Sequence, residues 1–189
     1  EGGPVTAPAD TIELIRYGQE EFPAIRPTLV SLYSEVYADQ LADPFFSVER
    51  FEQRLEGYAS RPGWEAVVAY DGGEAAGYAF ASTLPEGSAW WAGMLEPLPE
   101  EQTAEDGRRT LALFELMVRR PWRGTGLARR VHEELLAGRP EERVTLLVES
   151  SHPKVRALYE SWGYRNAGDQ QPFPDAPVYA TMMRPLRTT

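Results

Sequence analysis

The spacing of apolar residues divides the first half of the chain into strands and helices. Residues 11–16 (TIELIR) alternate apolar and polar side chains, which predicts a strand, whereas residues 22–40 repeat apolar side chains at helical spacing. Ser47 precedes the stretch VERFEQRLEGYA, so we expect it to cap a second helix. Residues 64–70 and 74–83 flank an Asp-Gly turn, and this arrangement predicts an antiparallel hairpin.

The second half alternates strands and helices after one long polar segment. Residues 84–109 are rich in Pro, Gly and acidic residues, so the segment is either a mobile surface loop or a cover over a substrate. After it the pattern predicts strands at 110–118, 143–148, 164–167 and 178–183, and helices at 126–137 and 153–162. The order β-α-α-β-β-β-α-β-α-β-β predicts a mixed α/β (α+β) fold.

Composition and charge limit the domain count and the partners. A chain of 189 residues that is 42% hydrophobic is enough for one core, so we expect a single domain at 11–187 behind a flexible tail at 1–10. The net charge of −10 disfavours binding to nucleic acid and to acidic membranes. The absence of cysteine excludes a thiol nucleophile, and two histidines make no zinc set, so no metal is expected. Residues 1–10 do not read as a signal peptide, and we expect a cytoplasmic protein; a homodimer stays open.

The turn at residues 119–126 has the composition of an anion-binding site. RRPWRGTG lies between a predicted strand and a predicted helix, where backbone N–H groups and the helix dipole attract an anion. Gly124 and Gly126 let the backbone approach that anion closely. An isolated RGTG is more often an ordinary turn, but the flanking elements and arginines favour a phosphate or pyrophosphate. The arginines of this stretch are Arg119, Arg120, Arg123, Arg129 and Arg130.

Two motifs in this half resemble those of the GNAT acetyltransferase superfamily. In VRRPWRGTGLA, Arg123, Gly126 and Ala128 match the family's acyl-coenzyme A signature, and in HPKVRALYESWGY the later motif is matched by Leu158, Tyr159, Gly163 and Tyr164. The resemblance implies a GNAT-like central mixed sheet flanked by helices, and acetyl-CoA as cosubstrate. His152 stands where the family commonly has Asn. The residues implied to contact the cosubstrate are Met117, Val118, Arg123, Gly124, Thr125, Gly126, Leu127, Ala128 and His152.

The same resemblance implies that Tyr159 is the general acid. Its hydroxyl would protonate the leaving CoA thiolate, and the alternative is a tyrosine buried in the core beside Val155 and Leu158.

The candidates for the general base are carboxylates and histidines of this region. Glu115 interrupts an apolar strand, where a charge is costly unless it is paired or used, so it is either the base or the ion-pair partner of a neighbouring arginine. Glu149, at the end of the next strand, is the second candidate base. His132 has polar neighbours in its helix, and we expect it to be solvated.

Together these observations predict an N-acetyltransferase. It would transfer acetyl from acetyl-CoA to a primary amine by direct attack in a ternary complex, because a chain without cysteine forms no cysteinyl intermediate. The net negative charge favours a small cationic acceptor, and a protein N-terminus or lysine stays open. Trp90 and Trp91 either frame the acceptor pocket through cation–π contact or anchor in the core. A non-catalytic acyl-CoA-binding or regulatory module is the alternative function.

Overall fold

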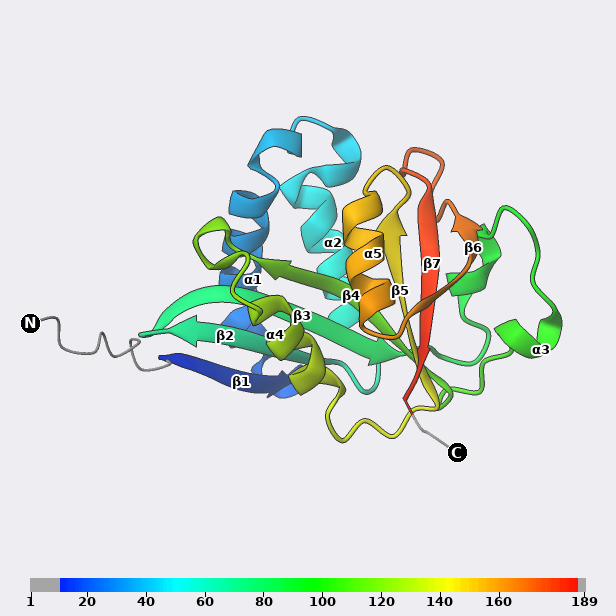
Figure 1. Cartoon of the computed structure of the whole chain (residues 1–189), viewed down its shortest axis with the longest axis horizontal. Coiled ribbons are helices and arrows are strands. Elements are labelled where there is room, and N and C mark those ends of the chain that lie inside the picture. Colours follow the sequence, from blue (N-terminus) through cyan, green and yellow to red (C-terminus); the bar gives the residue numbers. More distant parts are fainter. Residues whose placement is uncertain (1–10, 187–189) are drawn as a thin grey trace, which may run out of the picture.

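One mixed sheet runs through the protein, and helices cover both of its faces (Figure 1). The computed structural model describes residues 11–186, so the predicted tail at 1–10 lies outside the described residues. Within them, the sheet has seven strands in the order β1-β2-β3-β4-β5-β7-β6, and only β4 and β5 are parallel neighbours. The strands are β1 Ile12–Gly18, β2 Glu65–Asp71, β3 Glu74–Thr83, β4 Thr110–Val118, β5 Arg143–Glu149, β6 Arg165–Gln170 and β7 Tyr179–Pro185. The predicted mixed fold is confirmed.

The helices form one layer on each face of the sheet. Helices α1 (Phe22–Val36) and α2 (Val48–Ala59) pack on one face, and α4 (Leu127–Leu136) and α5 (Pro153–Ser161) pack on the other. The short α3 (Glu100–Thr103) lies in the 84–109 segment. No helix within residues 11–186 is long and apolar enough to cross a membrane.

Local sequence signals place most elements within a few residues. The Ser47 hydroxyl accepts a hydrogen bond from the Arg50 N–H (3.2 Å), which confirms the predicted cap of α2. Gly72 and Gly73 have φ angles of +56° and +88°, as the predicted hairpin turn requires. Strand β6 (RNAGDQ) runs to residue 170 rather than 167, because a polar edge strand has no apolar alternation that marks its end.

The 84–109 segment is anchored at the base of β4 and β5 by a buried carboxylate. Glu105 accepts hydrogen bonds from Trp91 Nε1 (3.0 Å), the Thr110 hydroxyl (2.9 Å) and Arg143 Nη2 (3.0 Å). Its side chain is 2% exposed, and the Arg143 guanidinium also lies over the Trp91 ring. A bridge between Met94 and Gln170 ties the segment to β6. This part of the chain is therefore packed against the sheet rather than loose on the surface.

Strands β4 and β5 part after three pairs of residues. Thr110, Leu111 and Ala112 pair with residues 143–145, and no pairing between the two strands continues beyond Ala112 in the part of the chain that the structure describes. Figure 1 shows the two arrows pointing apart from this shared base. The facing edges of both strands are left open, and they border a gap in the middle of the sheet.

A bulge in β4 turns a charged side chain toward the α1/α2 face. Ala81 pairs with Leu113 and Phe80 pairs with Glu115, so Phe114 is the extra residue. Leu113 and Leu116 both pack on the α4 side of the sheet, so Phe114 and Glu115, which lie between them, both face α1 and α2. The bulge therefore places Glu115 in the gap.

We predict that Glu105→Ala lowers the free energy of unfolding by about 3–5 kcal/mol, because it leaves the buried Arg143 guanidinium without its partner. Urea denaturation measures the loss. The matched control is Glu142→Ala, which removes an exposed carboxylate paired with Arg109 (3.3 Å) and should cost about 1 kcal/mol or less. Equal losses in the two variants would contradict the anchoring role of Glu105.

Candidate active site

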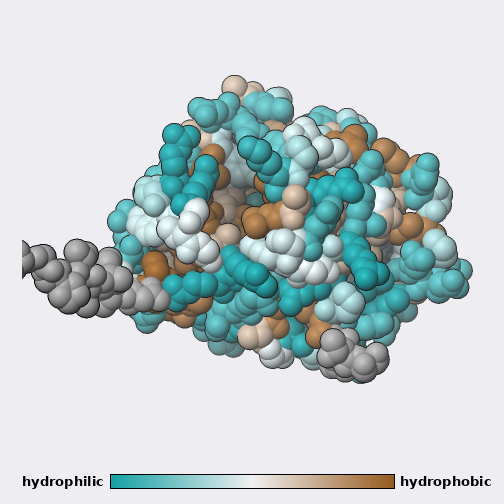
Figure 2. All heavy atoms as spheres, in the orientation of Figure 1, coloured by the Kyte–Doolittle hydropathy of each residue, from teal (hydrophilic) through white to brown (hydrophobic). Residues whose placement is uncertain are grey.

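Two cavities meet in the gap between β4 and β5. The first, called here the aromatic cavity, has a volume of about 380 Å³ and lies between the α1/α2 face, the 84–109 segment and the chain before β7. The second, called here the cradle cavity, has a volume of about 590 Å³ and runs along α5 toward the turn before α4. Figure 2 shows a central hollow in which hydrophobic atoms lie recessed between hydrophilic ones. The cavities share Tyr37, Phe46, Leu113, Phe114, Glu115, Leu147 and Tyr179.

Glu115 is the charged group of the shared wall. Its carboxylate has no hydrogen bond or ion pair with another residue of the described chain, so the predicted alternative of a structural ion pair is not formed. Burial raises the pKa of Glu115 to about 7, and the positive charge of Arg54 opposes that rise. A carboxyl group with this pKa exchanges a proton readily near neutral pH.

Tyrosines surround the carboxylate. Burial raises the pKa of each of these hydroxyls, and the charge of Glu115 raises it further. They therefore stay protonated across the neutral range and donate, rather than accept, a proton. They come from α1, α2, β3, α5 and β7 and their flanks: Tyr33, Tyr37, Tyr58, Tyr78, Tyr159 and Tyr179.

Tyr159 is buried on the inner side of α5 and lines the cradle cavity. It packs edge-on against Trp162 (5.2 Å between ring centroids) and Tyr164 (5.5 Å). Val155 and Leu158, which precede it, are 41% and 45% exposed at the wall of the same cavity. Both side chains are therefore accessible to a ligand that enters the cavity.

The predicted anion cradle has the backbone geometry of a binding turn. Gly124 and Gly126 adopt φ angles of +76° and +82°, and a Cβ on either would point into open space. Within residues 11–186, the amide N–H groups of residues 124–129 receive no hydrogen-bond acceptor, and the first helical bond runs from the Arg130 N–H to the Gly126 carbonyl. These free donors at the start of α4 fit the pyrophosphate of a nucleotide cosubstrate.

The arginines of the cradle do not act as one group. Arg119 pairs with Glu35 (2.9 Å) and Glu74 (2.8 Å) and lies over the Trp122 ring, so it joins α1 to the hairpin instead of facing an anion. Arg123 donates to the Val118 carbonyl (3.1 Å) and reaches the cradle cavity. Arg119 is one of the five arginines of this stretch, but its charge is already neutralised by two carboxylates.

The other residues implied to contact the cosubstrate lie on the cradle cavity or beside it. Met117, Val118, Ala128 and His152 line the cavity. Gly124, Thr125 and Gly126 are exposed between two of its lining residues, Arg123 and Ala128. The Leu127 side chain is buried in the core, so only its backbone N–H faces the cradle.

Glu149 and His132 both differ from Glu115 in their surroundings. Glu149 lines only the cradle cavity and not the aromatic cavity, and the His152 ring lies 3.8 Å from its carboxylate. His132 is fully buried, and its Nε2 hydrogen-bonds the Tyr164 hydroxyl (2.6 Å). Burial lowers the pKa of His132 to about 4, so the prediction that it is solvated is wrong. It is a neutral core residue.

The two adjacent tryptophans have different positions: Trp90 lines a cavity and Trp91 is anchored in the core. Trp91 is buried and donates to Glu105, so it anchors the 84–109 segment. Trp90 lines the aromatic cavity together with Ser88 and Ala89. The segment thus forms a wall of the cavity, which supports its reading as a cover.

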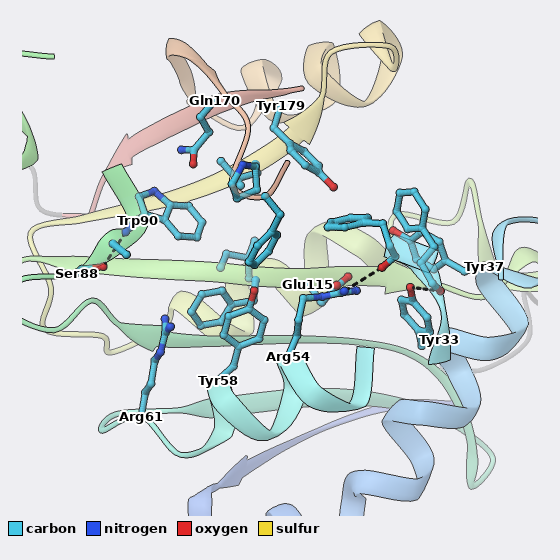
Figure 3. Close-up of a pocket in the computed structure, with 18 residues that line it drawn as sticks. Tyr33, Tyr37, Arg54, Tyr58, Arg61, Ser88, Trp90, Glu115, Gln170 and Tyr179 are labelled. Carbon is cyan, nitrogen blue, oxygen red and sulfur yellow. Dashed lines mark hydrogen bonds between the residues drawn. The ribbon is translucent and has the colours of Figure 1, made fainter. Parts of the chain in front are cut away.

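Sequence reasoning missed two cationic side chains of the aromatic cavity. Arg54 and Arg61 line it, with Tyr58 between them (Figure 3). The three residues are spaced i, i+4 and i+7, which puts them on one side of α2 and its end. That spacing is visible in the sequence, but the strand that this side faces is not.

Comparisons with known proteins agree with this geometry. The sequence profile described as the acetyltransferase (GNAT) family matches residues 27–164, which is most of the chain. The chain belongs to the GNAT acetyltransferase family. It is therefore an acetyl-CoA-dependent N-acetyltransferase with an acceptor that the family alone does not specify.

Solved structures show the same fold at low sequence identity. An acetyltransferase from Thermus thermophilus is 23% identical, with 93% of this chain and 97% of that chain covered and a TM-score of 0.57. A GNAT acetyltransferase from Staphylococcus aureus is 12% identical (93% and 99% covered, TM-score 0.60). ElaA from Escherichia coli is 14% identical (92% and 99% covered, TM-score 0.61). No curated protein sequence matches the chain.

We predict that CoA at about 100 times its Kd stabilises the protein by about 2.7 kcal/mol, a rise of roughly 5–11 °C in Tm. Gly126→Val should abolish this rise while the protein still folds, because a β-branched residue disfavours the positive φ that the cradle needs. Gly138→Val is the matched control: Gly138 has a φ of +75° and open space at its Cβ, but it follows α4 at the other end. Loss of the CoA-dependent rise in both variants, or in neither, would contradict the cradle.

Proposed function

We propose that this acetyltransferase transfers acetyl from acetyl-CoA to the primary amine of a small acceptor, by direct attack in a ternary complex. The cradle cavity would hold acetyl-CoA and the aromatic cavity would hold the amine. The observation that carries this proposal is the position of Glu115 in the wall that both cavities share. A group that removes a proton from one substrate as it attacks the other must reach both.

The reaction needs one proton acceptor and one proton donor. The amine arrives as an ammonium ion, and Glu115 takes its proton. The amine nitrogen then attacks the thioester carbonyl carbon, so a C–N bond forms while the C–S bond breaks. The Tyr159 hydroxyl gives a proton to the departing CoA thiolate. The amide nitrogen loses its remaining extra proton, Glu115 releases the proton it took, and Tyr159 regains a proton from solvent, so the products are an N-acetylated amine, CoA and one proton.

Glu115 is favoured over Glu149 as the base. Both lie near the gap, but Glu149 lines only the cradle cavity, whereas Glu115 also lines the aromatic cavity. The pKa of about 7 leaves a substantial fraction of Glu115 ionised at neutral pH and makes it a stronger base than an ordinary carboxylate.

Burial and the charge of Glu115 both raise the pKa of Tyr159. The phenol therefore remains protonated while the leaving thiolate forms. Its position in the cradle cavity, on the helix that borders the open edge of β5, supports the acid role.

A small acceptor is favoured over a protein chain by the size and walls of the aromatic cavity. Its volume of about 380 Å³ lies in the range of small-molecule sites. Three separate parts of the chain enclose it: α1 and α2, the 84–109 segment, and residues 170–179.

We predict that kcat/KM rises with pH through about 7 and that Glu115→Gln removes this rise, because the amide cannot accept the proton. The folded state disfavours ionised Glu115, so the native protein loses stability as pH increases from about 4.5 through 7. Glu115→Gln should therefore be more stable than the native protein at pH 8, by about 1–3 kcal/mol in urea denaturation.

The control for the base is Glu149→Gln, which should keep the pH dependence of kcat/KM. Should Glu115→Gln retain the rising limb, or unfold more easily at pH 8, then Glu115 is a structural residue and the base lies elsewhere.

For the acid, Tyr159→Phe should lower kcat by about 10²-fold while CoA binding, measured by the thermal shift, stays nearly unchanged. The substitution removes one hydroxyl that has no hydrogen-bond partner in the described residues, so the packing against Trp162 and Tyr164 is retained. An unchanged kcat would assign Tyr159 to packing alone.

A further inference from the structure

The charges on the wall of the aromatic cavity differ in sign from the charge of the whole protein. The chain has a net charge of −10, yet Glu115 is the single acidic residue among the described residues that line this cavity, and two arginines line it as well. A polyamine with a second ammonium group would find no second carboxylate there. The expectation of a cationic acceptor rests on the total charge, and the cavity wall does not support it.

Arg61 presents its hydrogen-bond donors without an acidic partner. Its guanidinium lies over the rings of Tyr58 (5.3 Å) and Phe114 (5.4 Å), and it forms no ion pair or side-chain hydrogen bond within residues 11–186. Contact with the two rings holds the guanidinium in place but uses none of its five N–H donors. A guanidinium held in this way is prepared to bind a carboxylate through two parallel hydrogen bonds.

Arg54 has a different task in the same cavity. Its Nη1 donates to the Phe45 carbonyl (3.0 Å), and its guanidinium lies over the Phe45 ring (5.0 Å). Figure 3 shows its side chain reaching from α2 to the neighbourhood of Glu115, while Arg61 lies at the far end of the cavity. Arg54 therefore balances the charge of Glu115, and Arg61 is left for the ligand.

The two ends of the cavity are separated by an aromatic wall. Tyr58 stacks on Phe114 with 3.8 Å between ring centroids and an angle of 8°. Arg54 lies within α2, whereas Arg61 follows the end of the helix, and Figure 3 shows the two side chains at different parts of the cavity. A ligand that reaches from Glu115 to Arg61 thus needs an apolar body that covers the paired rings.

From these contacts we infer that the acceptor is an amine that also carries a carboxylate, with an aromatic or other apolar body between the two groups. The amine nitrogen lies at Glu115, the body lies against Tyr58 and Phe114, and the carboxylate pairs with Arg61. This inference rests on the proposed function for the position of the amine. It adds the class of acceptor that the cavity selects.

A series of three amines of one shape tests the inference. The probes are 4-(aminomethyl)benzoate, benzylamine and 4-(aminomethyl)benzylamine, which carry a negative, a neutral and a positive group at the far end. Thiol release from acetyl-CoA gives kcat/KM for each, and the thermal shift of the CoA-saturated protein gives binding of each amine. We expect kcat/KM for the carboxylate to exceed that for benzylamine by at least about 10-fold, with the diamine lowest.

Charge reversal at Arg61 supplies the decisive comparison. Arg61→Glu should invert the order of the three amines and leave the CoA-dependent thermal shift intact. Arg165→Glu is the matched control, because it makes the same change of charge at an exposed position on β6 outside both cavities, and it should keep the original order.

The outcomes separate this inference from the proposed function. The inference is overturned, and the proposed function stays in place, if kcat/KM for benzylamine or for the diamine equals or exceeds that for the carboxylate. A preference for the carboxylate that survives in Arg61→Glu also overturns it. Arg61-dependent binding of 4-(aminomethyl)benzoate without acetyl transfer supports the inference and contradicts the proposed function. If 4-(aminomethyl)benzoate is neither bound nor acetylated, the inference is overturned.

Discussion

The parting of two parallel strands is the constraint on which the rest of this protein depends. Strands β4 and β5 pair over three residues and then separate, so each keeps an open edge in the middle of the sheet. Helices pack on both faces, and a cavity lies on each side of the opening. In the proposed function, the two substrates enter from opposite sides and meet there. The bulge at Phe114 then decides which side chain of β4 they encounter, and that side chain is Glu115.

The electrostatics of the opening follow from the surroundings of Glu115, which is partly buried where the two cavities meet. Burial raises its pKa toward neutrality, and burial, together with the charge of Glu115, raises the pKa of the surrounding tyrosines. The arginines of the chain divide into two groups. Arg119 and Arg143 are neutralised by acidic partners and hold the framework, whereas Arg61 contacts two aromatic rings and stays available.

Features that depend on neighbouring residues were predictable from the sequence, and features that depend on distant contacts were not. The cap at Ser47 and the cradle glycines follow local rules of hydrogen bonding and backbone conformation. The ion pairing of Arg119 depends on Glu35, which lies 84 residues away in the sequence. His132 has polar neighbours in its own helix, but Tyr164, 32 residues later, closes over it. Glu115 stood out as a charge in an apolar strand, yet only the register with β3 reveals the bulge that aims it.

The central claim is that Glu115 takes the amine proton because burial brings its pKa close to neutral pH. The most direct measurement is the titration of the Glu115 side-chain carboxyl by 13C NMR in the free protein, compared with the pH dependence of kcat/KM. Our account predicts that the carboxyl titrates near 7 and that the rising limb of kcat/KM has the same midpoint. A carboxyl that titrates near 4.5, or a kinetic midpoint that differs from the Glu115 titration by more than about one pH unit, would contradict it.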